Sequence, residues 1–190
     1  KQKCISYRHK AAEKKGIKNI LEISSKSPKP NGISLSAFNL SLKIDNRNFC
    51  VEQLFQASKV FERGGPYTDL LKVSSREAKR DQRLKESGNI IAFNIMGKDF
   101  STEPKTLFYD WLYSNALLQN KNLLLKALEY NAFTDIEFNE KKSINCQAYS
   151  LALFCSIIKN NNKIIDSNNI SKEEFFEICQ KEYTIRWNSL

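Results

Sequence analysis

Residues 143–159 constrain the fold more than any other segment, because apolar side chains lie almost all round the helix that they are expected to form. The segment includes Leu151, Leu153, Phe154, Ile157 and Ile158. A helix that is apolar on every side has to be buried, so this one is expected at the centre of the molecule. Its apolar run is too short to cross a bilayer, which needs ~20 residues. We therefore expect no membrane-spanning segment and no membrane partner.

The rest of the chain supplies enough apolar material to surround such a helix. Hydrophobic residues make up 41% of the 190 residues and include 12 Phe and 7 Tyr, so a disordered chain is excluded despite 27% charged residues. This length fits one domain. We expect a basic N-terminal helix or arm at 1–18, followed by a domain over 19–190 with a terminal helix at about 171–188.

Helical periodicity and capping signals predominate along the chain. Helices are expected at 4–15, 50–63, 74–88, 104–119, 120–130, 143–159 and 171–187. Strands are expected at 20–24, 33–38, 40–44, 90–96 and 133–138, and a turn at 45–48. The two strands at 33–38 and 40–44 alternate apolar and polar residues, as a half-buried pair does. The predicted class is α+β, mostly helical, in a single compact domain with a few short strands and a central buried helix.

Positive charge is concentrated at the N-terminal end. The chain carries 30 Lys and Arg against 21 Asp and Glu, a net charge of +9. Residues 1–30 alone hold nine basic and two acidic residues. Such a segment suits a polyanion such as nucleic acid. A solvated, loosely held arm is the alternative.

Cysteine and histidine usage points away from metal chemistry. The five cysteines are odd in number and no two have CxxC spacing, and His9 is the single histidine. This pattern favours reduced thiols in a cytoplasmic protein and gives no reason to expect a zinc site. Residues 1–10 contain no apolar stretch typical of a secretion signal. We expect no metal and no cofactor.

The segment after Phe49 combines a carboxylate, an amide and an amine. On the helix expected at 50–63, Glu52, Gln56 and Lys59 fall within about 60° of one another and are expected to face a cleft. A carboxylate beside an amine can polarise a leaving group or attack an acetal carbon. The alternative is the wet face of an amphipathic helix.

These residues also carry a resemblance to a known family. Phe49-Cys-Val-Glu52 and Gln56-Ala-Ser-Lys59 resemble the "vE…Qa.K" motif of the NADAR (YbiA-like) superfamily, and Leu35-Ser-Ala-Phe38 resembles its "LSNF" segment. Ala37 replaces the Asn of that segment, and Asn39 follows closely.

Three longer stretches are similar to one branch of the superfamily, the NADAR antitoxins paired with DarT-type toxins. They are residues 58–71, 103–113 and 133–148. The Trp-Gly segment of many members is absent, and Phe133-Thr-Asp135 stands in its place.

The resemblance implies a hydrolase that removes ADP-ribose from guanine bases in DNA and so neutralises a DarT-type toxin. It implies ADP-ribosylated DNA as substrate and ADP-ribose as product. By analogy with glycosidases, the Glu52 carboxylate would stabilise the positive charge that develops on the sugar. Lys59 would act as an acid or form a transient Schiff base.

The same resemblance suggests substrate contacts for residues spread along the chain. They are Ser36, Asn39, Gln56, Gly64, Gly65, Arg80, Trp111, Asp135 and Asn145. Backbone N–H groups of the glycine pair could hold a pyrophosphate, Arg80 or Lys79 a phosphate, Trp111 a base, and the last two residues the ribose hydroxyls. Each also has an ordinary structural role available: a turn, a solvated helix face, the core or a helix cap.

Two other functions stay open at this point. The chain could be an N-glycosidase acting on a ribosylamino-pyrimidine intermediate of flavin synthesis. It could also be a non-catalytic module that binds ADP-ribosylated DNA or the toxin itself. Mutation of Glu52 separates a binder from an enzyme.

Overall fold

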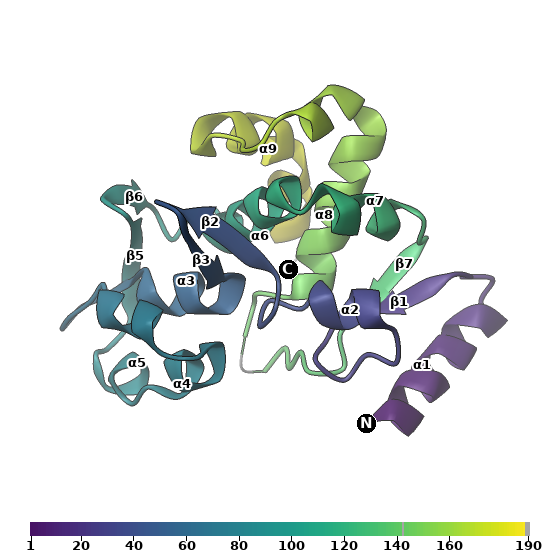
Figure 1. Ribbon diagram of the computed structural model, residues 1–190, viewed down its shortest axis with the longest axis horizontal. Coiled ribbons are helices and arrows are strands. Elements are labelled where there is room, and N and C mark those ends of the chain that lie inside the picture. The colour runs from purple at the N-terminus through teal and green to yellow at the C-terminus, as the bar shows by residue number, and fades with distance from the viewer. Residues whose placement is uncertain (142, 189–190) are drawn as a thin grey trace.

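The computed structural model describes residues 1–141 and 143–188 (Figure 1). The helices are α1 (Gln2–Lys14), α2 (Pro30–Ser34), α3 (Val51–Ala57), α4 (Ser75–Arg80), α5 (Arg83–Glu86), α6 (Leu107–Gln119), α7 (Lys121–Leu128), α8 (Gln147–Asn160) and α9 (Lys172–Asn188). The strands are β1 (Ile20–Glu22), β2 (Ser41–Ile44), β3 (Arg47–Cys50), β4 (Lys59–Phe61), β5 (Ile90–Ile95), β6 (Lys98–Phe100) and β7 (Ala132–Thr134). Two short 3₁₀ helices are η1 (Thr68–Lys72) and η2 (Asn162–Asp166).

This architecture confirms the predicted α+β, mostly helical class in a single compact domain. Residues 189–190, at the end of the expected domain, and Lys142, in one of the family-like stretches, lie outside the described residues.

The strands form three small sheets rather than one. Strand β1 pairs with β7 in parallel, β2 and β3 form an antiparallel hairpin, and β4, β5 and β6 form an antiparallel sheet in that order. The β1–β7 pair aligns Ile20 with Ala132, so the segments that follow the two strands run side by side.

Helices α6 and α8 share the centre of the fold (Figure 1). Eleven of the 13 residues of α6 and nine of the 14 of α8 are buried. The buried carboxylate of Asp110 on α6 accepts hydrogen bonds from Thr106, Ser150 and Tyr183, which makes its burial tolerable. The predicted central helix is therefore confirmed, although it begins at Gln147 rather than at 143.

The strand predicted at 33–38 is wrong. Pro30 begins the short helix α2, and a turn follows in which the N–H of Leu40 bonds to the carbonyl of Ser36. Strand β2 pairs instead with β3. The turn between them places Asp45 at φ 47° and Asn46 at φ 62°, and positive φ at both central residues is typical of a tight hairpin.

Two predicted helices are also shorter than expected. The helix predicted at 50–63 ends at Ala57, and Lys59–Phe61 forms β4, which pairs with β5. The helix predicted at 74–88 breaks at Asp81, whose carboxylate accepts the backbone N–H of Arg83 at 2.9 Å. A short side chain that bonds to nearby backbone competes with helix continuation, which explains the break.

Candidate active site

Glu52 lies in the first turn of α3, where two backbone bonds fix its position. The N–H groups of Val51 and Glu52 donate to the carbonyls of Leu40 and Ala37, each at 2.9 Å. The start of α3 is therefore held against the turn after α2. Glu52 is only 4% exposed, and a carboxylate near a helix N-terminus is favoured by the helix dipole.

Three polar side chains form a continuous chain at this position. The ammonium of Lys59 donates to Oε1 of Gln56 at 2.7 Å, and Nε2 of Gln56 donates to Oε1 of Glu52 at 2.8 Å. The predicted meeting of these three residues is confirmed. Its expected geometry is not, because Lys59 reaches in from β4, and Glu52 and Gln56 are buried rather than open to a cleft.

Lys59 is an unusual lysine because its ammonium is largely desolvated. Its Nζ lies 4.6 Å from the ring centroid of Phe55, and its nearest hydrogen-bonded partner is a neutral amide. Burial lowers the pKa of Lys59 to about 8, Lys79 adds to the lowering, and Glu52 opposes it. A substantial neutral fraction therefore exists near physiological pH, which is the form that can attack carbon.

Lys79, considered in the sequence only as an alternative to Arg80 for holding a phosphate, contacts Glu52 instead. Its Nζ lies 3.3 Å from Oε1 of Glu52 and 4.9 Å from the ring centroid of Phe38. It comes from α4 and its side chain is half-exposed, so it lies at the solvent side of the buried carboxylate. Its neighbour Arg80, which was selected instead, is exposed on α4. Nothing in the spacing of the two basic residues distinguishes them.

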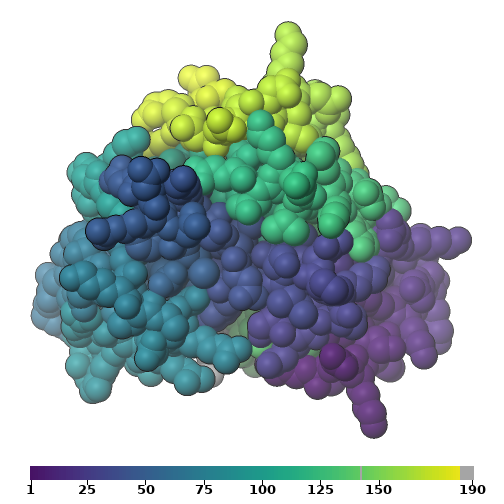
Figure 2. All heavy atoms as spheres, in the orientation of Figure 1, coloured from purple at the N-terminus to yellow at the C-terminus, as the bar shows by residue number. Residues whose placement is uncertain are grey.

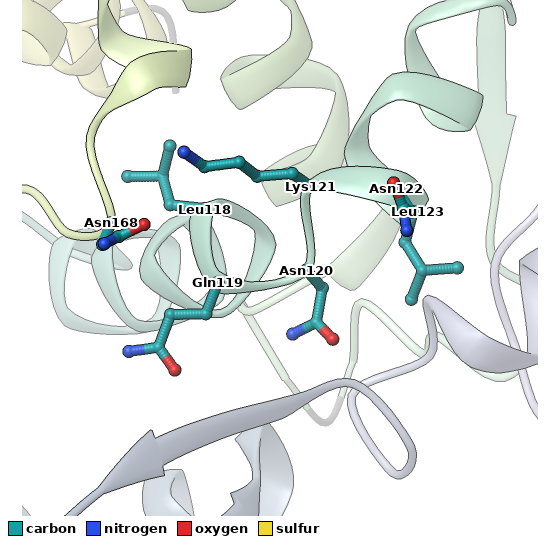
Figure 3. Close-up of a pocket in the computed structure, with 7 residues that line it drawn as sticks. All are labelled: Leu118, Gln119, Asn120, Lys121, Asn122, Leu123 and Asn168. Atoms are coloured by element: carbon teal, nitrogen blue, oxygen red, sulfur yellow. The ribbon is translucent and has the colours of Figure 1, made fainter.

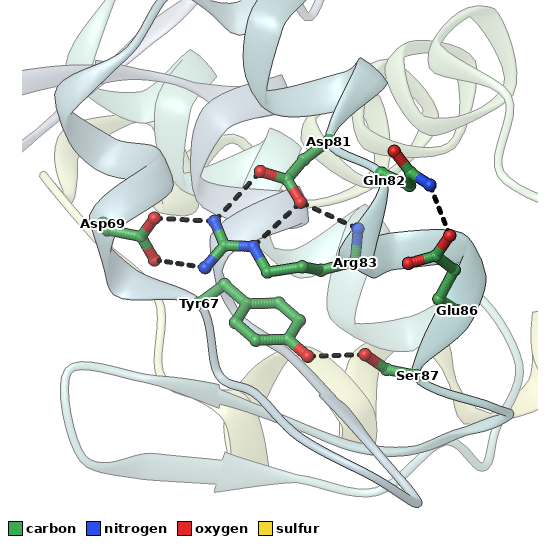
Figure 4. A network of polar contacts seen from close by, with 7 residues as sticks. All are labelled: Tyr67, Asp69, Asp81, Gln82, Arg83, Glu86 and Ser87. Atoms are coloured by element: carbon green, nitrogen blue, oxygen red, sulfur yellow. Dashed lines mark hydrogen bonds and ion pairs between the residues drawn. The ribbon is translucent and has the colours of Figure 1, made fainter.

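Helix α4 is held in place by a network around Arg83 (Figure 4). The guanidinium donates to Asp69 at 2.6 Å and to Asp81 at 2.9 Å, and it stacks 4.4 Å from the ring of Tyr67. Tyr67 in turn contacts the hydroxyl of Ser87. The network ties the end of α4 and the start of α5 to η1.

A second group of side chains lies along the turn after α2. Gln147 accepts from the N–H of Ala37 at 2.7 Å and donates to the carbonyl of Ile23 at 2.8 Å. It also hydrogen-bonds Asp135. Gln147 thus positions the segments that carry Ala37, Ile23 and Asp135. The sequence predictions did not select it, because its place at the start of the buried helix was its only distinguishing feature.

Asp135 follows β7 and is partly withdrawn from water. Burial raises its pKa, which the N–H groups of Glu137 and Phe138 and the side chain of Gln147 partly oppose. The pKa of buried Tyr109 is raised mainly by burial and further by the charges of Glu52, Tyr113 and Asp135. Asp135 is linked to the turn that holds Glu52 through Gln147, which bonds both Asp135 and the N–H of Ala37.

Comparison with known families decides the identity. The family model of the DarT1-associated NADAR antitoxin matches residues 1–188. The chain belongs to the DarT1-associated NADAR antitoxins. Comparison with curated proteins gives no match.

In this antitoxin, the remaining predicted site residues take varied positions. Asn39 donates to Ser36 Oγ at 3.0 Å and to the Ile33 carbonyl at 2.9 Å, so the pair braces the turn after α2. Asn145 is partly exposed, yet its Oδ1 is buried with no hydrogen-bond partner among the described residues. That oxygen has an unused acceptor capacity next to the Gln147 segment.

Gly64 and Gly65 form the turn that closes β4. The N–H of Gly64 donates to the carbonyl of Phe61 at 3.4 Å. Gly65 has φ 82°, and a Cβ there would lie 2.3 Å from the carbonyl oxygen of Lys59. Glycine is therefore required by the close approach of two backbones, which places this turn directly beside Lys59.

Trp111 lies apart from Glu52. Its indole N–H donates to the carbonyl of Ile170 at 2.9 Å, and its ring packs 4.7 Å from that of Phe100. Trp111 and Tyr109 are two residues apart on α6 and so point in different directions. Trp111 lines a cavity of about 510 Å³ beside the start of α9.

A cavity of about 400 Å³ at the junction of α6 and α7 is also remote from these residues (Figure 3). Its side chains are engaged in holding the fold: Asn120 donates to the carbonyls of Ser41 and Ala116, each at 2.8 Å, and Lys121 donates to that of Asp166. The cavity beside α9 does bring an amine and a carboxylate together, Lys172 and Glu173 at 3.7 Å, but their side chains are 40% and 74% exposed, whereas Glu52 is buried.

Residues 1–141 and 143–188 are the part of the chain that the structure describes. In that part of the chain, no helix combines the length and apolar character needed to cross a membrane. The same residues contain no group of three or more His, Cys, Asp or Glu side chains placed to hold a metal ion.

Proposed function

We propose that this antitoxin is an ADP-ribosyl glycohydrolase that removes ADP-ribose from guanine bases in DNA. The observation that carries the proposal is the hydrogen-bonded chain from Lys59 through Gln56 to the buried carboxylate of Glu52. Cleavage of an N-glycosidic bond needs stabilisation of a cationic sugar and protonation of the leaving base, and these groups can supply both.

Glu52 is the candidate for stabilising the sugar cation. Its carboxylate is buried, so its field is weakly screened by water, and Gln56 and Lys79 fix its orientation. A positive charge developing on the anomeric carbon next to it is stabilised more strongly than the neutral ground state.

Lys59 has two possible roles that differ in the covalent step. As an ammonium it donates a proton to the departing guanine nitrogen. As a neutral amine it bonds to the anomeric carbon while the carbon–guanine bond breaks and guanine takes up a proton. Transfer of the second amine proton to the ring oxygen then opens the sugar ring and gives an imine. Water hydrolyses this imine to ADP-ribose and free lysine. The pKa of about 8 makes both forms available.

The depth of the site determines how DNA has to be presented. Glu52 and Gln56 are 4% and 5% exposed, so a base stacked in a duplex cannot reach them. The modified nucleotide has to be single-stranded or turned out of the helix. Figure 2 shows an indentation between the teal segment around residue 80 and the purple segment around residue 30, which we propose as the route of entry. The unpartnered Oδ1 of Asn145 and the carboxylate of Asp135 are candidates for the ribose hydroxyls.

The proposed setting is the cytoplasm, with the DarT-type toxin as functional partner. None of the five cysteines forms a disulfide, which suits a reducing compartment.

The test is to incubate the protein with an oligonucleotide that carries ADP-ribosyl-guanine and to follow free ADP-ribose and restored guanine by mass spectrometry. Glu52→Gln should release product about 10²–10³ times more slowly, as is typical when one electrostatic contact to a transition state is lost. Glu129→Gln, an exposed carboxylate on another face, is the matched control.

Three outcomes would contradict the proposal. If the wild-type protein releases no ADP-ribose from the oligonucleotide, the proposed activity is wrong. If it instead cleaves a ribosylamino-pyrimidine, the protein is the small-molecule N-glycosidase. A Glu52→Gln variant that still neutralises the toxin in cells would identify a binding module. Borohydride added during turnover separates the two roles of Lys59, since only an imine is trapped as a covalent adduct on that residue.

A further inference from the structure

Helix α1 rests on the rest of the molecule along one narrow stripe. Ile5 is 2% exposed, His9 contacts Thr134 Oγ1 at 3.0 Å, and Ala12 is half-buried. These three residues are spaced by four and three positions, so they share one face of the helix. Figure 1 shows α1 at the edge of the molecule beside β1. The contacts fix which face of α1 points outward.

The opposite face carries a regular pattern of lysine and tyrosine. Lys3, Tyr7, Lys10 and Lys14 are all exposed, and Tyr7 is 77% exposed. At 100° per residue they fall within about 60° of one another and about 180° from the buried stripe. Glu13, the acidic residue of α1, lies about 60° outside this group, which we call the outer stripe. In Figure 2 side chains of this purple segment extend into solvent.

We propose that the outer stripe binds single-stranded DNA, with its three lysines on phosphates and Tyr7 stacked on a base. A lysine face with an aromatic ring inside it combines the two elements of sequence-tolerant single-strand binding, phosphate neutralisation and base stacking. The helical rise separates Lys3 from Lys10 by about 10 Å and Lys10 from Lys14 by about 6 Å, so separate phosphates can be contacted.

An anionic membrane is a poorer fit for the same face. Membrane-surface helices bury a broad apolar face, whereas the apolar residues Ile5 and Ala12 of α1 are turned toward the protein. A protein partner with an acidic surface, including the toxin, is the competing occupant and is tested below.

The start of α1 contacts the loop that follows Asp135. Lys1, at the start of α1, forms an ion pair with Glu137 at 3.1 Å, and Ser25 bonds to the same carboxylate at 3.0 Å. Glu137 lies two residues after Asp135, so the N-terminal end of α1, whose outward face carries the outer stripe, is near the loop that carries that carboxylate. The inference rests on the proposed function for the choice of DNA as the polymer.

The experiment measures binding rather than turnover, using unmodified single-stranded oligonucleotide at several salt concentrations. The slope of log K against log salt, where K is the association constant, is negative. The triple variant Lys3→Ala, Lys10→Ala and Lys14→Ala should make this slope less steep by about 2, since each phosphate contact contributes about 0.7. The control changes Lys98, Lys126 and Lys163, three exposed lysines elsewhere, to alanine, which alters the net charge equally. Its slope should stay near that of the wild type.

Tyr7→Leu tests the stacking part. It should weaken binding about fivefold or more at every salt concentration with an unchanged slope, because a base loses its aromatic platform while the lysines remain. Alanine and leucine favour helix, so α1 persists in all variants, and circular dichroism verifies this.

Equal slopes for the two triple variants would overturn the inference. So would an outer-stripe variant that binds DNA normally but loses affinity for the toxin, since the occupant is then a protein. Hydrolase activity is a separate readout: a protein that releases no ADP-ribose but shows the predicted slope change refutes the proposed function and retains the outer stripe.

Discussion

The Arg83 network and the Glu52–Lys59 chain both join basic side chains to carboxylates, and they are built in opposite ways. Arg83 is 41% exposed at its side chain and binds two carboxylates, Asp69 and Asp81. Lys59 is largely buried and binds a neutral amide. The pKa of Arg83 is raised by its carboxylates and theirs are lowered, whereas burial lowers the pKa of Lys59.

This difference distinguishes a charged group that stabilises the fold from one that can take part in a reaction. Arg83 is paired with two carboxylates, so the guanidinium stays protonated at any physiological pH. The Lys59 ammonium is desolvated without a direct carboxylate partner, so its proton is easily given up. An under-compensated cation beside a buried carboxylate is a feature of reactive sites rather than of stabilising ones.

The sharpest test of this comparison exchanges each cation for an uncharged side chain. Lys59→Met should reduce release of ADP-ribose by about 10²–10³-fold, because proton donor and nucleophile are both lost. Arg83→Met should reduce it by less than about tenfold while lowering the urea midpoint of unfolding. Single-turnover assays and urea titrations on both variants provide the measurements. Comparable activity losses in the two variants would mean that the clusters do not differ in function.

Two glutamines allow the role of burial to be tested in the same way. Gln147 bridges the backbone of Ala37 and Ile23 inside the protein, and Gln119 bridges the N–H and carbonyl of Lys43 at the surface. Gln147→Leu should lower the free energy of unfolding by about 2–4 kcal/mol, because two backbone groups lose their partners away from water. Gln119→Leu should cost less than about 1 kcal/mol, because water replaces the amide. Calorimetry or urea unfolding compares them.

The pH dependence of stability should reveal the desolvated lysine. The unfolded chain holds the Lys59 proton up to pH 10.5, and the folded protein up to about pH 8. Between these values the unfolded state binds more protons, so the free energy of unfolding rises with pH, by up to about 3 kcal/mol. Below pH 8 the cost of the buried charge is fully present. The rise should be absent in Lys59→Met when urea unfolding is measured at pH 7.5 and pH 10, and a parallel pH dependence in both proteins would refute it.

The smallest effect is expected at Lys79. Its charge helps to lower the pKa of Lys59, so Lys79→Gln should move that pKa upward by less than about one unit. The alkaline midpoint of the rate profile, measured by single-turnover assays, would shift in the same direction. Arg80→Gln, the neighbouring exposed change, should leave the midpoint in place.

Secondary structure could be predicted from the local sequence where a segment has a single hydrophobic period. The buried helix α8, the capping box at Ser74 and Glu77 and the strand at 90–95 all follow from patterns within a few residues. The closeness of Glu52, Gln56 and Lys59 was predicted correctly even though α3 ends at Ala57. A three-residue separation after Gln56 keeps the lysine within reach whether the chain continues as a helix or enters a strand.

Features that depend on distant partners were not predictable from one sequence. Strand β4 exists because β5, some thirty residues later, pairs with it, and a helical pattern over 50–63 contains no sign of that partner. Gln147 and Lys79 belong to the site through contacts with Ala37 and Glu52, which only the tertiary fold creates. The turn at 45–48 was predicted, but the hairpin was not, because the strand at 40–44 was paired with 33–38 instead of with Arg47–Cys50.

The bond between Ala37 and Gln147, together with the parallel pairing of β1 and β7, bears on when the antitoxin becomes competent during its synthesis. A ribosome that has translated as far as residue 130 has made Glu52 and Lys59, but neither β7 nor the amide that braces the turn over Glu52. Closing a loop of this length is slow compared with forming local helices. Nascent chains that end before Gln147 thus lack the contacts that hold Glu52 in place, and they are expected to acquire them only after α8 has begun to be made.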